Sequence, residues 1–130
     1  MTAPAMNDAP VKMIGQIAIN VHDTTRAVEF YRDTLGLKLL FTAGQLAFFD
    51  CGGVRLMLSP PEKPEFDHPS SILYFKVDNI QAAYDRLVHR EVKIEDKPHL
   101  VARMPDHDLW LAEFRDSEGN LMALMSEVRR

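Results

Sequence analysis

RLML, at residues 55–58, predicts a short strand, and the chain repeats it near its end as LMAL at residues 121–124. A turn sequence precedes each copy, DCGG at 50–53 and DSEG at 116–119. We therefore interpret the chain as two copies of one unit, in which Met57 of the first copy corresponds to Ala123 of the second. Such units pair because one unit alone leaves a face of its sheet uncovered.

The same order of elements surrounds both copies. In the first unit, alternating apolar residues predict a strand at 14–21, and apolar residues at helical spacing predict a helix that Asp23 caps and Gly36 ends. Further strands of this unit are predicted at 37–43, 46–50 and 54–59. In the second unit we predict a strand at 72–77, a helix capped by Asp78, and strands at 92–96, 109–114 and 121–126.

The two units define the predicted domain organisation. We expect one domain at residues 12–130, with a first βαβββ module at 12–60, a proline-rich linker at 61–70 and a second module at 71–130. Residues 1–11 are small, polar and proline-containing, and are expected to form a flexible N-terminal tail. The second module is the longer one, and its extra residues are placed in an insertion at 97–108. The fold class is therefore α+β with mixed sheets.

Composition limits the classes of function. The chain has 130 residues, enough for one domain with its own core, and a formal net charge of −4 with a pI of about 5.7. A nucleic-acid surface would need a basic face, and a membrane span would need roughly 18 apolar residues in a row, a run that the sequence lacks. With one cysteine, Cys51, and no signal-peptide pattern, the protein is expected in the cytoplasm.

Three sequence phrases resemble those of a known family. VHD at 21–23, AVEFYRDTLGL at 27–37 and DSEGN at 116–120 resemble motifs of the vicinal oxygen chelate superfamily, which includes glyoxalase I, bleomycin-resistance proteins and extradiol dioxygenases. Ser117 stands where the turn of the family has proline. The resemblance covers about residues 12–128 and implies a curled mixed sheet around a pocket, with a homodimer as the expected assembly. These motifs are structural, so they imply the fold and no particular reaction.

The resemblance also implies where a metal would bind, with one ligand from the first strand and one from the last strand of each module. The corresponding residues are Gln16, Met57, Ile72 and Ala123. A catalytic divalent metal needs imidazole nitrogen or side-chain oxygen, which only Gln16 of the four can offer. The thioether of Met57 suits copper(I), and the other two residues have no donor atom. We therefore expect no metal site and no other cofactor.

The function that follows is the binding of a small aromatic or amphipathic molecule without a metal. Strand alternation assigns six residues to the pocket face: Gln16, Asn20, Arg55, Met57, Tyr74 and Ala123. An Arg55 directed into the pocket would meet a carboxylate or phosphate, because a lone buried charge is costly. Its alternative is a surface pair with an acid such as Glu113. For each of the six, the alternative is that the side chain simply fills the space between the sheets.

The rival function is an enzyme of the same superfamily, a lyase, isomerase or dioxygenase with a non-standard or metal-dependent site. Its catalytic candidates are His99, His107 and Glu113, since imidazole titrates near neutrality and the two histidines flank the insertion. The histidines form an acid–base pair over the pocket mouth, or they are two exposed loop residues. Trp110 suits a lid or a dimer contact. Whether the chain catalyses a reaction stays open, and a domain without any small ligand is a third alternative.

Overall fold

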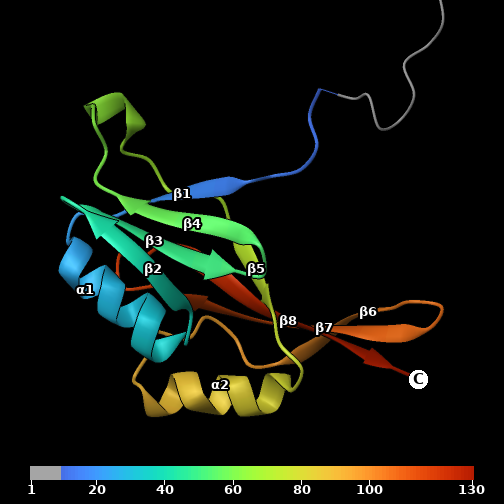
Figure 1. The fold of residues 1–130 in the computed structure, drawn as a ribbon. Coiled ribbons are helices and arrows are strands. Elements are labelled where there is room, and N and C mark those ends of the chain that lie inside the picture. The colour runs from blue at the N-terminus through green and yellow to red at the C-terminus, as the bar shows by residue number, and fades with distance from the viewer. Residues whose placement is uncertain (1–9) are drawn as a thin grey trace, which may run out of the picture.

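The structure is a computed structural model that describes residues 10–130, so most of the predicted N-terminal tail lies outside the described residues. Its strands form two four-stranded mixed sheets that do not close into a barrel (Figure 1). None of the helices in this part of the chain is long and apolar enough to cross a membrane. The α+β fold class predicted from the sequence is confirmed.

The first sheet comes from the first half of the chain. Its elements are β1 (Gln16–Asn20), α1 (Thr24–Glu29), the π-helical η2 (Phe30–Thr34), β2 (Lys38–Ala43), β3 (Leu46–Cys51) and β4 (Val54–Ser59). The strand order is β1-β4-β3-β2, and β1 and β4 are parallel. Asp23 caps α1 by accepting a hydrogen bond from the backbone N–H of Arg26 at 3.1 Å. Gly36, with a φ of 78°, follows the helical segment as predicted.

The second sheet repeats this order. After the short 3-10 helix η3 (Pro64–Phe66) come β5 (Leu73–Lys76), α2 (Ile80–His89), β6 (His99–Arg103), β7 (His107–Arg115) and β8 (Leu121–Arg129). The strand order is β5-β8-β7-β6. Parallel pairing places Ala18 opposite Met57 in the first sheet and Tyr74 opposite Ala123 in the second. The predicted repeat is therefore confirmed, and Met57 and Ala123 occupy matching positions.

The second module differs from the sequence prediction in two places. The segment at 92–96 is not a strand and makes a single bridge, between Ile94 and Phe114, whereas β6 lies within the predicted insertion at 97–108. Val92 and Ile94 alternate as in a strand because both pack against the edge of the core. The cap of α2 is Asn79, whose side chain accepts a hydrogen bond from the backbone N–H of Ala82 at 3.0 Å, and not its neighbour Asp78.

One hydrophobic core joins the two modules. Helices α1 and α2 pack against one face of the sheets, and both modules contribute large buried side chains, among them Tyr31, Phe49 and Phe114. The opposite faces, which we call the open faces, carry exposed rings such as Phe41 and Tyr74. The open face of each sheet, which neither α1 nor α2 covers, is the candidate ligand surface.

Candidate functional site

Four side chains on the open face of the first sheet form an ordered group, which we call the arginine platform: Gln16, Phe41, Phe48 and Arg55. The Nε of Arg55 donates a hydrogen bond to Oε1 of Gln16 at 2.7 Å. The guanidinium carbon lies 5.3 Å from the centroid of the Phe48 ring, a distance at which charge and ring attract. Phe48 stacks on Phe41 with 4.4 Å between the ring centroids.

Strand register brings these residues together. Gln16 lies opposite Arg55 in the parallel pair of β1 and β4. Phe41 lies opposite Phe48, but only after a register shift in β2 between Leu39 and Phe41. Leu39 packs against the core, so the irregularity turns Phe41 to the opposite face.

Phe41 and Phe48 were not predicted as site residues. Strict alternation places Phe41 on the same face as Leu39, which would direct both into the core. Phe48 is flanked by the buried residues Ala47 and Phe49, so the stretch reads as a strand buried on both faces. The local sequence carries no signal that would assign either ring to the open face.

Arg55 carries a charge that no acid among residues 10–130 neutralises at close range. None of the ion pairs within this range includes Arg55, so the alternative of a pair with Glu113 is not formed. Asp50, directly opposite Arg55 on β3, accepts a hydrogen bond from the backbone N–H of Gly53 at 3.2 Å. The two terminal nitrogens of Arg55 therefore remain available to an anion.

The four positions implied for a metal do not fit one. Gln16 uses its amide oxygen for Arg55 and donates through Nε2 to the sulfur of Met57 at 3.7 Å. Ile72 and Ala123 offer no donor atom, and Ala123 is fully buried. Within the described range, no three His, Cys, Asp or Glu side chains gather as a possible metal site. The amide oxygen of Gln16, which already accepts a hydrogen bond from Arg55, and the thioether of Met57 do not match the ligands that a divalent metal prefers.

On the open face of the second sheet, Tyr74 and Glu113 flank Ala123. Tyr74 lies opposite Ala123 across the parallel pair of β5 and β8, and Glu113 lies opposite it across the antiparallel pair of β7 and β8. Tyr74 is exposed, whereas Ala123 is covered by its neighbours. The predicted residues therefore form two sets. Gln16 and Arg55 lie on the open face of the first sheet, and Tyr74, Glu113 and Ala123 lie on that of the second.

His99 and His107 do not meet. His99 begins β6 and lies opposite Leu111, whereas His107 begins β7 four residues before Leu111, so about 13 Å of strand separates the two positions. Each imidazole lies against a residue close to it in sequence. Trp110 packs against the core and does not cover an open face.

Asn20, which was predicted to face a ligand, holds the linker beside β1. Its side-chain Nδ2 donates to the carbonyl oxygens of Phe66 at 2.8 Å and of His68 at 2.9 Å. Its backbone N–H donates to Oγ of Ser70 at 3.1 Å. Both protons of the Asn20 side-chain amide are used in these hydrogen bonds. Asn20 therefore has a structural role that the sequence did not indicate.

A buried hydrogen-bond network joins the two modules at the DSEGN turn. The hydroxyl of Tyr31 donates to Asp116 at 2.6 Å, and both residues are buried. Asp116 also accepts hydrogen bonds from the backbone N–H groups of Glu118 at 2.9 Å and Asn120 at 2.8 Å. Burial, together with the charge of Asp116, raises the pKa of Tyr31 well above its ordinary value. The helix motif and the turn motif of the sequence therefore meet in space.

His22 bridges the linker and this turn. Its Nε2 lies 3.0 Å from Asp67, and its Nδ1 lies 3.3 Å from Glu118. The hydrogen bond and charge of Asp67, followed by the charge of Glu118, raise the pKa of His22 above its ordinary value. Glu118 also accepts hydrogen bonds from the backbone N–H groups of His22 and Asp23, which fixes the start of α1.

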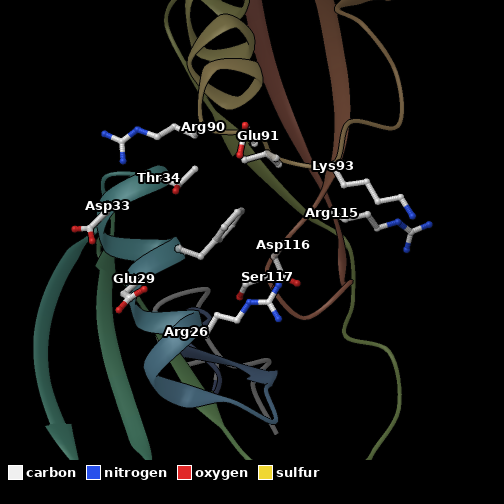
Figure 2. A pocket seen from close by; sticks show the side chains of 12 residues that line it. Arg26, Glu29, Asp33, Thr34, Arg90, Glu91, Lys93, Arg115, Asp116 and Ser117 are labelled. Atoms are coloured by element: carbon white, nitrogen blue, oxygen red, sulfur yellow. The ribbon is translucent and has the colours of Figure 1, made fainter.

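A cleft of about 460 Å³ lies between α1, residues 90–93 and the DSEGN turn (Figure 2). Figure 2 shows Arg26 directed toward Asp116 and Ser117, while Arg90 and Lys93 extend away from the centre. The Oγ of Ser117 is buried there without a hydrogen-bond partner among the described residues. The charged side chains of this cleft do not point toward one position where a ligand could bind, unlike the hydrogen-bonded side chains of the arginine platform.

The sequence and the fold identify the family of the chain. The model of the Glyoxalase/Bleomycin resistance protein/Dioxygenase superfamily matches residues 13–124, and the chain belongs to this superfamily. The uncharacterized protein YraH of Bacillus subtilis is 32% identical over 126 residues, which cover 84% of this chain and 94% of YraH. The metallothiol transferase FosB of Lysinibacillus sphaericus is 28% identical over 91 residues, which cover 66% of this chain and 64% of FosB.

Solved structures share the fold. TnmS3, an antibiotic binding protein from Streptomyces sp. CB03234, matches with a TM-score of 0.73 and 24% identity, over 92% of this chain and 98% of TnmS3. A lactoylglutathione lyase from Agrobacterium tumefaciens matches with a TM-score of 0.69 and 24% identity, over 91% of this chain and 96% of the lyase. At these identities the likeness establishes the fold alone.

Proposed function

We propose that this protein binds a small aromatic or amphipathic molecule on its open sheet faces without using a metal. The arginine platform is the observation that supports the proposal most strongly. It places an exposed ring beside an oriented positive charge, and its side chains do not form a set of ligands that fits a metal. Small-molecule sites commonly combine apolar walls with a few placed polar groups. TnmS3, which shares the fold, is an antibiotic binding protein. The expected compartment is the cytoplasm, where the free thiol of Cys51 stays reduced.

A homodimer would complete the site. The open faces leave apolar side chains in water, including Phe41, Ile72 and Tyr74, which are 48%, 40% and 49% exposed. A second copy that covers these faces would bury the side chains and turn an open surface into an enclosed pocket. In such a pocket the arginine platform would contact one side of the ligand, and Tyr74 would contact the other.

An enzyme is the second candidate, because Tyr74 and Glu113 flank Ala123 on one open face. A phenol and a carboxylate at such positions can donate and accept a proton. The matching proteins include a metallothiol transferase and a lactoylglutathione lyase. Loss of turnover with retained ligand binding in Glu113→Gln would support this candidate, whereas His99 and His107 are too far apart to act on one proton together.

Metal analysis of the purified full chain tests the metal-free part of the proposal. We expect far less than one equivalent of tightly held Zn, Ni, Mn or Fe per subunit. A content of about one equivalent would overturn this part, because a metal held that tightly needs a set of ligands that the four implied positions lack.

Thermal-shift screening against flat aromatic compounds tests ligand binding. A ligand that binds only the folded state stabilises it by about 2.7 kcal/mol at roughly a hundred times its Kd, so a true ligand should raise the melting temperature of the wild type. Phe41→Ala should lose most of this shift. Phe66→Ala removes an exposed phenylalanine of the linker and should keep it. Equal loss in both variants, or no shift with any compound, would count against the platform as the site.

A further inference from the structure

We infer that the ligand is an aromatic monocarboxylate, whose carboxylate binds Arg55 and whose ring lies on Phe41. The inference rests on the proposed function and specifies the chemical class of the ligand. It follows from three features of the arginine platform: the charge around Arg55, the orientation of the guanidinium group and the exposure of Phe41.

The charged residues that face one another across β2, β3 and β4 beside Arg55 sum to one positive charge, although none of them forms an ion pair. Lys38 lies opposite Asp50, and Asp50 lies opposite Arg55, so the three are neighbours across β2, β3 and β4. None of the ion pairs within residues 10–130 includes any of them. Two cations and one acid leave one charge to be neutralised, which fits a carboxylate better than a dianionic phosphate.

Gln16 fixes the direction in which Arg55 presents its remaining donors. The Nε of Arg55 is used by Oε1 of Gln16, and the guanidinium lies over Phe48. The amide of Gln16 is itself oriented by its contact with the sulfur of Met57. The two Nη atoms then form the free edge, from which a carboxylate can accept two parallel hydrogen bonds. A guanidinium that is already held in place loses less side-chain entropy when it binds.

Phe41 supplies the surface for the apolar part of the ligand. It is 48% exposed, whereas Phe48, on which it stacks, is 9% exposed. A flat ring attached to the bound carboxylate would cover Phe41 by stacking. A neutral aromatic compound gains only this ring contact, so the charge of the ligand should separate strong binders from weak ones.

Matched pairs of ligands test the inference on the full chain. Benzoate, 2-naphthoate and 9-anthracenecarboxylate would each be compared with the corresponding neutral amide by calorimetric titration. The acids should bind roughly ten-fold to a hundred-fold more tightly than their amides, the usual contribution of a hydrogen bond to a charged group. In Arg55→Met this ratio should fall to about one, with amide binding retained. Arg26→Met removes an arginine of α1 on the helix side and should keep the ratio.

Other outcomes overturn the inference. Equal affinities for acids and amides in the wild type would show that charge is not recognised, while the proposed binding function would stand. An acid preference that survives in Arg55→Met would assign recognition to another residue. If no acid binds at up to about 1 mM, the inference fails, and the amides decide separately whether the proposed function fails as well. A thermal melt of Arg55→Met establishes that this variant is folded.

Discussion

Gln16 leaves the charge of Arg55 uncancelled on the open face of the first sheet. Its neutral amide oxygen holds Nε of Arg55 at 2.7 Å without cancelling the charge of the guanidinium. A carboxylate in the same place would hold the guanidinium as well but would neutralise it. The choice of amide or acid at position 16 therefore decides whether the arginine platform attracts anions.

Gln16→Glu is expected to weaken the binding of 2-naphthoate by about ten-fold or more, because an ion pair forms within the platform and the new carboxylate repels that of the ligand. Binding of the neutral amide should change little, and calorimetric titration measures both affinities. Gln45→Glu adds the same charge in the turn between β2 and β3, outside the platform. An equal loss in Gln45→Glu would show a general charge effect instead.

Tyr31→Phe is expected to destabilise the fold by about 1–3 kcal/mol, because it removes a buried donor from the charged Asp116. Urea unfolding measures the change in the free energy of unfolding. Tyr74→Phe removes the same hydroxyl from an exposed ring and should change stability by less than about 0.5 kcal/mol. Equal effects in the two variants would contradict the role assigned to the buried bond.

The bridge at His22 should make stability depend on pH. Asp67 and Glu118 raise the pKa of His22 in the folded chain, so the protonated imidazole stabilises the folded state. This contribution is fully present below about pH 6.5, the pKa of an unperturbed histidine, and is lost as the pH rises through the raised pKa. His22→Gln should therefore be less stable than the wild type at about pH 5.5 and approach it toward about pH 8.

Urea unfolding across this range measures the difference, and NMR titration measures the pKa of His22 directly. Asp67→Asn removes the largest cause of the shift and should lower the pKa of His22 toward its ordinary value. A pKa that stays raised in Asp67→Asn would show that Glu118 alone sets it.

Helix α2 begins at a residue that the sequence did not single out. Asn79 caps it through the hydrogen bond from Ala82, while the carboxylate of Asp78 makes no such bond. Asn79→Ala should cost about 1 kcal/mol of the free energy of unfolding. Asp78→Ala should cost less than about 0.5 kcal/mol. A larger loss of stability in Asp78→Ala than in Asn79→Ala would show that Asp78 is the cap. Denaturant unfolding of the two variants decides between them.

The elements that the sequence predicted correctly depend on local signals. Asp23, Gly36 and the turns before β4 and β8 each determine the conformation of only a few residues. The misplaced strand at 92–96 shows the limit of such signals, because an extended segment on the edge of the core alternates in the same way as a strand. The irregularity in β2 is equally hidden, since only its pairing with β3 reveals which face Phe41 takes.

The same limit applies to the candidate site. Gln16 and Arg55 could be placed on one face from alternation, and the structure pairs them across β1 and β4. The rings of Phe41 and Phe48 and the linker bonds of Asn20 depend on contacts between distant segments, which alternation does not describe. Alternation thus identified polar groups on the strands and missed the neighbours that orient them.

At the scale of the whole molecule, the proposed dimer requires that the open faces bury one another. A stable protein interface buries about 1,200–2,000 Å² in total, which needs most of an open face. Tyr74→Glu should convert the dimer to a monomer and weaken ligand binding, because it would bury an unpaired charge. Analytical ultracentrifugation measures the assembly. Val88→Glu places the same charge at an exposed apolar position of α2 and should leave the dimer intact.

A wild type that is monomeric under conditions where it binds ligand would contradict the dimeric pocket. Ligand binding would then have to occur on one open face alone, and Tyr74→Glu would have no effect on the affinity for a ligand held by Arg55.

The bond between Tyr31 and Asp116 is made once, although the chain is built from a repeat. Counted from the two helix caps, the counterpart of Tyr31 is Leu87, which has no hydroxyl group. The counterpart of Asp116 is Asp50, which bonds its own turn at Gly53. If a gene duplication produced the repeat, its halves have since diverged until they are no longer interchangeable. A gene rearranged to carry two first halves or two second halves would lack this bond, so each half now depends on the other for one partner of a buried contact.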